Sequence, residues 1–188
     1  MTSAQLNQRV QTRFPNFPST EFREELSVTV PLEEIESVCR ICRDELGFDF
    51  LMDITSVDHF GEEPRFEVVY ELYSLKGNIQ LRLKTKVSED KLEVPTVSHL
   101  WQTANWHERE IFDMMGIRFA NHPDLRRILM WDGYPFFPLR KDFPLEGKDS
   151  ELPDVAFTHP APLEGGPFVT LPNSGGTKDR EPRARGPE

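Results

Sequence analysis

The sequence predicts an α+β fold, in which a mixed or mainly antiparallel sheet is covered by helices and followed by an extended C-terminal segment. Residues 50–60, 65–75 and 79–87 alternate like consecutive strands joined by short turns. Residues 31–46 and 96–115 have the apolar spacing of amphipathic helices, and no regular period continues after the second of them. Strands joined by such short turns pair antiparallel, and the helices are available to bury the apolar face of their sheet.

Within each predicted strand, apolar residues recur at every second position, which places them on one face of the sheet. The residues expected on that face are Phe50, Met52 and Ile54 in the first strand, Phe66, Val68, Tyr70 and Leu72 in the second, and Ile79, Leu81, Leu83 and Thr85 in the third. An earlier strand is expected at residues 26–30, in the run LSVTV.

The expected helices begin and end at characteristic residues. Pro31 suits the first helical position, because an N–H there would lack a helical partner, and Gly47 follows the last apolar position of that helix. Gly116 ends the later helix in the same way, and a break is expected near residues 102–105. A shorter helix is expected at residues 3–14, where apolar residues lie four apart.

Composition and charge limit the classes of partner. The chain has 188 residues, of which 37% are hydrophobic and 29% charged, enough for one domain with extensions. Its formal net charge of −10 disfavours nucleic acid and anionic lipid as partners. The sequence contains no apolar run near the ~20 residues of a membrane helix, and its first residues show no secretory signal. We therefore expect a cytoplasmic chain that meets a membrane only through its partners.

Cys39 and Cys42 form a Cys-x-x-Cys pair in the middle of a predicted helix, and the chain has no other cysteine. An iron–sulfur cluster normally has four protein ligands, so this chain alone offers too few. A redox or zinc half-site is the functional interpretation of the pair. Because both residues lie on the apolar face of the helix, we expect them to pack in the core instead.

The segment from Glu108 to Pro144 mixes charged and apolar residues more densely than a free surface loop does. It contains six acidic and six basic residues, with bulky apolar residues between them. Charges among so much apolar surface are expected to be partly buried. Buried charges need a partner, either within the chain or across an interface.

Glu108 falls in the apolar stripe of the helix that ends at Gly116, so its carboxylate should be desolvated. We expect an ion pair between Glu108 and a downstream base, which would hold residues 117–144 against the helix. The candidate bases are Arg126, Arg127, Arg140 and Lys141. The alternative places Glu108 at a solvated helix edge. Arg109 can also pair with Asp113 one helical turn later.

Catalytic motifs are not evident in the sequence. A hydrolase or metal site could be assembled from His107, Glu108 and His122, but neighbouring helical positions point about 100° apart and no HExxH pattern occurs. His122 precedes Pro123 and is expected to cap a turn or to bond a backbone group. The sequence also lacks GxSxG, GxGxxG and the phosphate-loop pattern. We therefore assign no catalytic, cofactor-binding or metal-ligating residue.

Three regions are expected along the chain. Residues 1–116 form the α+β core domain, and residues 117–145 form an extended charged and apolar segment packed on the core and on a partner. Residues 146–188 hold seven prolines and six glycines, a composition close to that of irregular chain. We expect residues 146–172 to form an arm that lies on another protein, with residues 173–188 loose. The alternative is a tail that is disordered throughout.

Two blocks of residues carry a resemblance to a known family. The first block comprises Glu108, Arg109, Glu110, Asp113, His122, Arg126, Ile128 and Leu129, and the run ANWHERE extends it upstream. The second block is PLRKDFPL at residues 138–145. Together they resemble the thirty-kilodalton subunit family of NADH-quinone oxidoreductase, respiratory complex I. The resemblance covers roughly residues 25–160.

The resemblance implies a non-catalytic structural subunit of the peripheral arm, at the cytoplasmic face of the cell membrane. The implied partners are the hydrogenase-like subunit that forms the quinone pocket and the subunit that holds the terminal cluster. FMN and iron–sulfur clusters are then expected in partner subunits, with no cofactor in this chain. The motif residues become folding and interface residues: Glu108, Arg109, Glu110, Asp113, His122, Arg126, Arg127, Arg140, Lys141 and Asp142.

Two alternatives stay open. The same module could serve a related membrane-bound hydrogenase or dehydrogenase complex, because other subunits choose the electron donor. A stand-alone metal-dependent enzyme is an alternative of a different class, and a stoichiometric metal in the pure chain would favour it. If the chain is a subunit, its interface should bury more than ~1,000 Å². Arg126 and Arg127 are then the bases expected to hold it to its partner.

Overall fold

The structure of the chain is a computed structural model, which describes residues 3–23, 25–145 and 147. The described residues up to Lys141 belong to one compact unit, and a second unit begins at Asp142. The segment from residue 117 to Lys141 therefore lies in the same unit as the sheet and helices. Apart from Gly147, the arm predicted at residues 146–188 lies outside the described residues.

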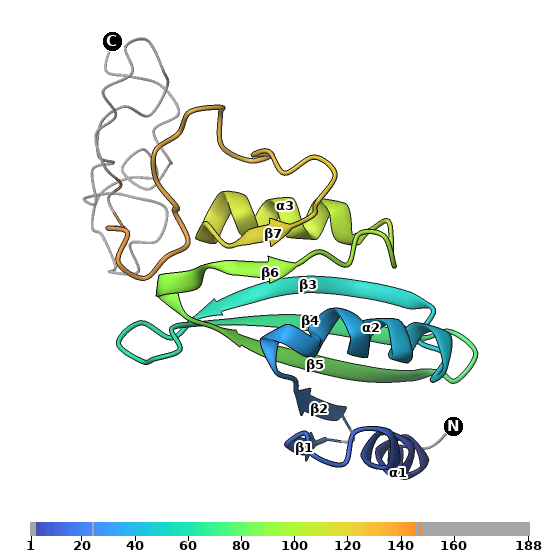
Figure 1. Ribbon diagram of the computed structural model, residues 1–188. Helices are drawn as coiled ribbons and strands as arrows, with labels where there is room; N and C mark the ends of the chain where they lie inside the picture. Colours follow the sequence, from blue (N-terminus) through green and yellow to red (C-terminus); the bar gives the residue numbers. More distant parts are fainter. Residues whose placement is uncertain (1–2, 24, 146, 148–188) are drawn as a thin grey trace, which may run out of the picture. The chain divides into compact units, whose positions relative to one another are not determined.

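A five-stranded sheet forms the centre of the first unit, with the strand order β1-β2-β5-β4-β3 (Figure 1). Its strands are β1 (Ser19–Phe22), β2 (Glu25–Thr29), β3 (Phe50–Asp58), β4 (Phe66–Ser74) and β5 (Ile79–Val87). The predicted antiparallel meander of β3, β4 and β5 is confirmed, whereas β2 joins β5 in parallel. The sheet is therefore mixed and mainly antiparallel. The edge strand β1 was not predicted, because its four residues are largely exposed and carry no apolar alternation.

Three α-helices accompany the sheet within the described residues, and none of them is long and apolar enough to cross a membrane. They are α1 (Ser3–Arg13), α2 (Ile35–Asp44), which follows the 3-10 turn η1 (Leu32–Glu34), and α3 (Ala104–Met115). The predicted end signals are confirmed: Pro31 precedes η1, and Gly47 and Gly116 adopt left-handed backbone after α2 and α3. The helix expected from residue 96 begins later, because residues 96–103 form turns and irregular chain.

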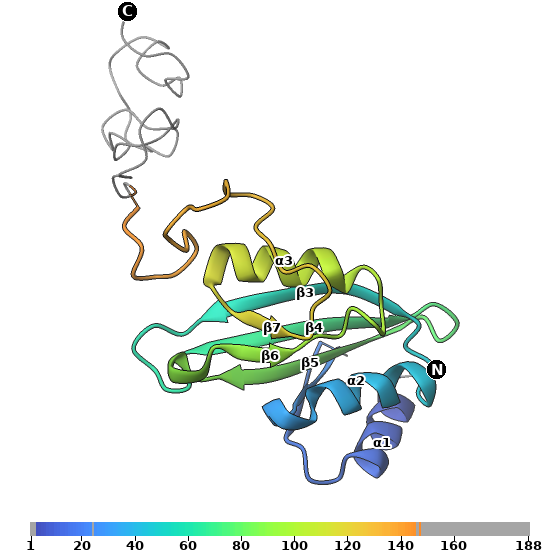
Figure 2. The same ribbon diagram turned by 45° about the horizontal axis from the view of Figure 1, so that its top comes forward.

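A second, two-stranded parallel sheet was not predicted. Its strands are β6 (Glu93–Pro95), which follows the 3-10 turn η2 (Glu89–Lys91), and β7 (Arg118–Ala120). Each strand has three residues, too few to display an alternating pattern. The helix α3 connects β6 to β7 and runs alongside β3 in both views (Figures 1 and 2). This arrangement fixes the position of α3 before the chain continues past Gly116.

The apolar core lies between one face of the large sheet and the helices. Every second residue of β4 and β5 is buried, as the alternation predicts. Cys39 and Cys42 are buried free thiols on α2, which confirms their assignment to the core. Burial raises the pKa of both thiols, to about 12 for Cys42, so they stay protonated near neutral pH.

The opposite face of the sheet carries pairs of charged residues between neighbouring strands. Arg82 of β5 pairs with Glu71 of β4, and Lys84 lies 3.5 Å from Glu67. These side chains are partly exposed, so each pair contributes little to stability. The sheet is therefore apolar on one face and polar on the other, as expected for an antiparallel meander.

The prediction for the buried face of β3 was wrong at two positions. Phe50 and Met52 are each 43% exposed, whereas Leu51 is 1% exposed and Ile54 is also buried. The cause is an irregularity in the pairing of β3 with β4 between Leu51 and Asp53. An extra residue of this kind shifts the alternation by one, so Leu51 and Ile54 both face the core.

This register can be tested with two alanine substitutions. Leu51→Ala should lower the free energy of unfolding by about 2–5 kcal/mol, because it leaves a cavity in the core. Met52→Ala should cost less than about 1 kcal/mol, because its side chain is at the surface. Urea unfolding of both variants measures the difference. A larger loss for Met52→Ala would show that the regular alternation is the correct one.

Candidate functional site

Residues 117–141, here called the ribbon, continue from the end of α3 and run past that helix after β7 (Figures 1 and 2). Ile117 and Phe119 are buried at its start. Between residues 121 and 141 the described chain has neither helix nor strand, which confirms the prediction from its failed periodicity. Its backbone N–H groups therefore need other partners, and two buried carboxylates bind several of them.

Asp113, in the last turn of α3, is the first of these two anchors. Its side chain is buried, and Oδ2 accepts hydrogen bonds from three consecutive backbone N–H groups. These belong to Ile128 at 2.9 Å, Leu129 at 2.6 Å and Met130 at 2.9 Å. Oδ1 accepts a hydrogen bond from Arg127 Nη1 at 2.6 Å, in an ion pair whose side chains are 12% and 0% exposed. One carboxylate thus fixes four consecutive residues of the ribbon.

The buried charge of Asp113 is stabilised by these contacts. Burial alone would raise the pKa of its carboxyl group. The Met130 N–H, the Arg127 guanidinium and the two neighbouring N–H groups outweigh burial and hold the pKa below its usual range. Successive N–H groups that converge on one oxygen form an anion-binding arrangement. This compensation is needed because an acid near a helix C-terminus is otherwise unfavourable.

Arg127 lies within the chain rather than at its surface. Its Nη1 also donates to the Asp113 carbonyl at 2.9 Å, and its Nη2 donates to the Phe136 carbonyl at 3.2 Å. Its guanidinium carbon lies 5.1 Å from the ring centroid of Phe137 and 5.7 Å from that of Tyr134. The expectation that Arg127 binds a partner is therefore wrong, because its donors are used inside the ribbon.

The expected ion pair between Glu108 and an arginine was also wrong. Glu108 is fully buried, which excludes the solvated helix edge as well. Its Oε1 accepts the Val97 N–H at 2.7 Å, and its Oε2 is hydrogen-bonded to Thr96 Oγ1. Within the described residues its one ion-pair partner is His122, whose Nε2 lies 3.8 Å away. The ribbon arginines reach the C-terminal end of α3 instead, so Asp113 takes the role predicted for Glu108.

His122 bonds backbone groups on both sides of its ring, as predicted. Its Nδ1 accepts the Asp124 N–H at 3.0 Å, and its Nε2 lies 3.2 Å from the Asn105 carbonyl, to which it can only donate. This places the ring proton on Nε2. Burial lowers the pKa of His122, and the nearby Arg109 contributes in the same direction. The neutral ring therefore holds the turn after β7 against the start of α3.

Asp58, at the end of β3, is the second anchor and was not predicted. Arg65 donates from Nε and Nη2 to its two oxygens, each at 2.8 Å, and both side chains are nearly or fully buried. The Lys141 N–H donates to Asp58 Oδ2 at 2.8 Å and so fixes the end of the ribbon. The Arg65 guanidinium, together with the Lys141 N–H and the Arg140 charge, lowers the pKa of Asp58. The sequence contains a sign of this, because Asp58 has the same parity as the buried Ile54.

Arg140 closes the C-terminal end of α3. Its Nε donates to the Met115 carbonyl at 2.7 Å, and its guanidinium carbon lies 4.6 Å from the ring centroid of Phe137. A Cβ atom on Gly116 would lie 2.7 Å from Arg140 Nη2 and 2.8 Å from Phe137. Gly116 is therefore required twice, for its φ of +78° and for this close approach.

The other predicted site residues are divided between the interior and the surface. Arg109 is buried, and its Nε donates to the Arg126 carbonyl at 3.2 Å rather than to Asp113. The Arg126 side chain is exposed and pairs with Asp124 at 3.0 Å. Residues at the surface also include Glu110, Lys141 and Asp142. The structure thus gathers Asp113, Arg127 and Arg140 at the end of α3, with Glu108 and His122 at its start.

Large apolar side chains on α3 and the ribbon point outward. Trp106 is 62% exposed, Leu129 57% and Leu139 56%. The Arg109 guanidinium lies 4.8 Å from the Trp106 ring and supports it from below. Two of these residues follow directly from the anchoring, because Leu129 N–H binds Asp113 and Leu139 N–H binds the Met114 carbonyl. The arrangement is suited to binding a protein rather than to bond-breaking chemistry.

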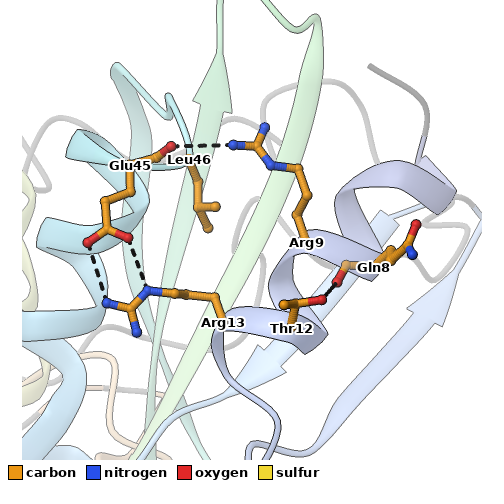
Figure 3. A pocket seen from close by; sticks show the side chains of 6 residues that line it. All are labelled: Gln8, Arg9, Thr12, Arg13, Glu45 and Leu46. Carbon is orange, nitrogen blue, oxygen red and sulfur yellow. Dashed lines mark hydrogen bonds and ion pairs between the residues drawn. The ribbon is translucent and has the colours of Figure 1, made fainter.

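A surface pocket of about 370 Å³ lies between α1 and the end of α2 (Figure 3). It is lined by Gln8, Arg9, Thr12, Arg13, Glu45 and Leu46. Arg13 pairs with the Glu45 carboxylate at 3.0 Å, and Arg9 donates to the Glu45 carbonyl at 3.4 Å. These contacts tie α1 to α2. Within residues 3–23 and 25–145, no group of three or more His, Cys, Asp or Glu side chains is placed to hold a metal ion.

The profile of a protein family described as the respiratory-chain NADH dehydrogenase, 30 Kd subunit, matches residues 28–149 of this sequence. The chain belongs to this family. The matched range contains α3, the ribbon and both anchoring carboxylates. The resemblance carried by the two sequence blocks is therefore confirmed.

Curated relatives of this family align with most of the chain. A C-type subunit of NADH-quinone oxidoreductase from Rhizobium meliloti (strain 1021) is 53% identical over 137 residues, which span 72% of this chain and 75% of that protein. The corresponding C-type subunit from Geotalea uraniireducens (strain Rf4) is 50% identical over 131 residues, or 70% of this chain and 80% of that protein. The relatives are thus subunits of an oxidoreductase complex.

Solved structures of the same fold support the α+β architecture. A trypsin-resistant fragment (1-134) of Nqo5 has a TM-score of 0.59 and 33% identity, covering 64% of this chain and 99% of the fragment. A chain of the membrane-bound sulfane sulfur reductase, an archaeal respiratory membrane complex, has a TM-score of 0.68 and 26% identity. That match covers 76% of this chain and 85% of the other.

The Asp113 anchor can be tested by removing its charge. Asp113→Asn should lower the free energy of unfolding by about 3–5 kcal/mol, because Arg127 loses its ion-pair partner in a buried site. Asp132→Asn removes an exposed charge from the same ribbon and should change stability by less than about 0.5 kcal/mol. Denaturant unfolding measures both values. Equal stability of the two variants would contradict the anchoring role.

Glu108 should make stability depend on pH in a defined direction. Burial raises the pKa of Glu108 to about 7, against 4.5 for the free group, while Thr96 and the Val97 N–H oppose the shift. Because the folded-state pKa is raised, the contribution is fully present below pH 4.5 and is lost as pH rises to 7. Its size is on the order of 3 kcal/mol.

The variant Glu108→Gln mimics the protonated carboxyl and isolates this effect. Wild type should lose stability relative to Glu108→Gln by that amount between pH 4.5 and pH 8. His122 is present in both proteins, and the lowered pKa values of Asp58 and Asp113 act only at more acidic pH. Urea unfolding at pH 5 and pH 8 gives the four values required. A difference that does not vary with pH would show that Glu108 stays charged throughout.

Proposed function

We propose that the chain is a non-catalytic structural subunit of the peripheral arm of a proton-pumping NADH:quinone oxidoreductase, where it braces the subunit that forms the quinone site. Membership of the 30 kDa subunit family supports the parent complex. The observation that carries the bracing role is the arrangement of the ribbon. Its charges are neutralised inside the chain, while apolar side chains are presented outward.

This arrangement favours docking for a physical reason. A surface ribbon without regular structure normally exposes polar backbone groups and charged side chains to water. Here Asp113 and Asp58 hold the backbone from inside, and Trp106, Leu129 and Leu139 remain exposed. Exposed apolar side chains on a rigid support are typical of protein interfaces, which deplete charge at their centre.

The identity of the partners follows from the proposed complex. We infer contact with the hydrogenase-like quinone-site subunit and with the subunit that holds the terminal iron–sulfur cluster. FMN and the iron–sulfur clusters would reside in partner subunits, and this chain would carry no cofactor. The protein would lie at the cytoplasmic face of the cell membrane, attached through those partners. Among the motif residues, the exposed Glu110, Arg126 and Lys141 are the charged side chains available to them.

A second candidate is the same module in a related membrane complex with another electron donor. The similarity to a chain of the membrane-bound sulfane sulfur reductase, at a TM-score of 0.68, favours this possibility. The relatives from NADH-quinone oxidoreductase are much closer in sequence, at 50–53% identity against 26%. This difference makes the NADH-dependent complex the better-supported assignment.

The docking surface can be tested by placing charges on it. The double variant Leu129→Glu with Leu139→Glu should fold normally, because both side chains are exposed, but should reduce co-purification with the membrane-bound complex at least tenfold. Leu75→Glu is the matched control, since Leu75 is 65% exposed at the turn between β4 and β5. Its co-purification should equal that of wild type.

The parent complex can be tested in a strain that lacks this gene. Its membranes should lose NADH:quinone reductase activity, and the wild-type gene should restore it. Unchanged activity in the deletion strain would contradict assignment to the NADH-dependent complex and favour the second candidate. Full retention of the double leucine variant would instead contradict the docking surface alone.

A further inference from the structure

Glu108 is a buried ionisable side chain that the anchoring of the ribbon does not use. Its Oε1 is bound by the Val97 N–H, whereas its Oε2 faces only a hydroxyl, Thr96 Oγ1, and the more distant His122 ring. Thr96 Oγ1 lies 2.9 Å from Ser98 Oγ and accepts the Ser98 N–H at 3.1 Å. Ser98 is only half-buried, so two hydroxyl groups link the buried carboxyl to the surface.

This chain of hydroxyls is saturated in either protonation state of Glu108. When the carboxyl is ionised, Thr96 donates its proton to Oε2 and accepts from the Ser98 hydroxyl. When the carboxyl is protonated, Oε2 donates to Thr96, and Thr96 donates to Ser98. In both states Thr96 Oγ1 makes one donated and two accepted hydrogen bonds, which is its full capacity. The change requires only rotation of hydroxyl protons.

His122 is the other group that could take up the proton, but its contacts oppose this. Its Nδ1 already accepts the Asp124 N–H, so protonation there would break that hydrogen bond. Its Nε2 proton is directed at the Asn105 carbonyl. The positive charge of Arg109 also disfavours a second charge on the ring. The proton therefore resides on the carboxyl group of Glu108.

The remaining groups that face Glu108 do not compete for the proton. The Cys39 thiol of α2 and the Tyr70 hydroxyl of β4 are buried on the opposite side, and burial raises the pKa of each well above neutrality. Both stay protonated near pH 7, so they add no charge beside the carboxyl. Apart from His122, the surroundings on α2 and β4 are thus neutral, while Val97 and Thr96 supply the polar contacts.

We propose that Glu108 is an internal proton-binding site, which exchanges its proton with solvent through Thr96 and Ser98. In the uptake step, a solvent proton binds Ser98 Oγ, the Ser98 proton passes to Thr96 Oγ1, and the Thr96 proton passes to Glu108 Oε2. One proton enters and one carboxylate is neutralised, with no redox partner. The site joins the segment after β6, the helix α3 and the turn at His122, so its charge state bears on how these three are held together.

The test is a titration of the full-length chain by NMR, with ¹³C at the glutamate side-chain carboxyl carbons. The Glu108 signal should titrate with a midpoint near neutrality, well above those of exposed glutamates. Thr96→Val should raise this midpoint by about one unit or more, because the ionised carboxylate loses a donor. Ser98→Ala should keep the midpoint near that of wild type but broaden the signal, because the exchange route is interrupted.

Two control variants separate this role from general packing. Thr96→Ser keeps the hydroxyl and should restore the wild-type midpoint. Thr85→Val changes a buried threonine whose Oγ1 has no hydrogen-bond partner among the described residues, and it should leave the midpoint unchanged. A Glu108 signal that stays ionised from pH 5 to pH 9 would overturn the proposal, and this readout needs no variant. An unchanged midpoint and line width in both Thr96→Val and Ser98→Ala would overturn the exchange route. The proposed bracing function does not enter either result.

Discussion

The ribbon depends on one interaction, the binding of a buried carboxylate by consecutive backbone N–H groups. Asp113 carries a full charge in the interior, which is tolerated only when every lone pair has a donor. Three N–H groups and Arg127 meet that demand, and the same bonds satisfy a stretch of backbone that has no strand or helix to join. Neither side would be stable at this depth without the other. Asp58 repeats the arrangement with the Lys141 N–H at the far end of the ribbon.

Both anchors place the acid on a regular element and the donors on the irregular one. The end of α3 is positioned by β6, β7 and β3, so Asp113 is held in place before the ribbon packs against it. Arg140 then binds the Met115 carbonyl and closes the helix end. Because the charges are consumed by these contacts, the exposed part of the ribbon is left with side chains such as Leu129 and Leu139. A surface of this kind is consistent with a subunit that is stable only beside its neighbours.

The parts of the fold that repeat a simple period could be predicted from the sequence. The buried residues of β4 and β5, the packing of Cys39 and the cap at Gly116 all follow from local rules. The irregularity in β3 could not be predicted, since one extra residue leaves the composition of the strand unchanged. The strands β1, β6 and β7 are too short to show any period.

The candidate site was predicted as a set of residues but not as a set of pairs. Sequence alone indicates that the acids of α3 need partners, and Glu108 and Asp113 are both fully buried. Which base each acid receives depends on where the ribbon crosses the helix, a matter of tertiary structure. The bases meet Asp113, five positions after Glu108, while Glu108 receives a hydroxyl and an amide. Asp58 and Arg65 were missed because their pairing joins β3 and β4 to a segment much later in the chain.

The bonds to Asp113 from residues 128–130 come from the main chain, and every amino acid except proline offers the same group. The identity of the exposed Leu129 side chain is therefore independent of the force that holds its backbone. Evolution can replace that side chain without unfastening the segment, and one scaffold can acquire new binding preferences by point substitution. Subunits built in this way can be recruited into respiratory assemblies that use different fuels.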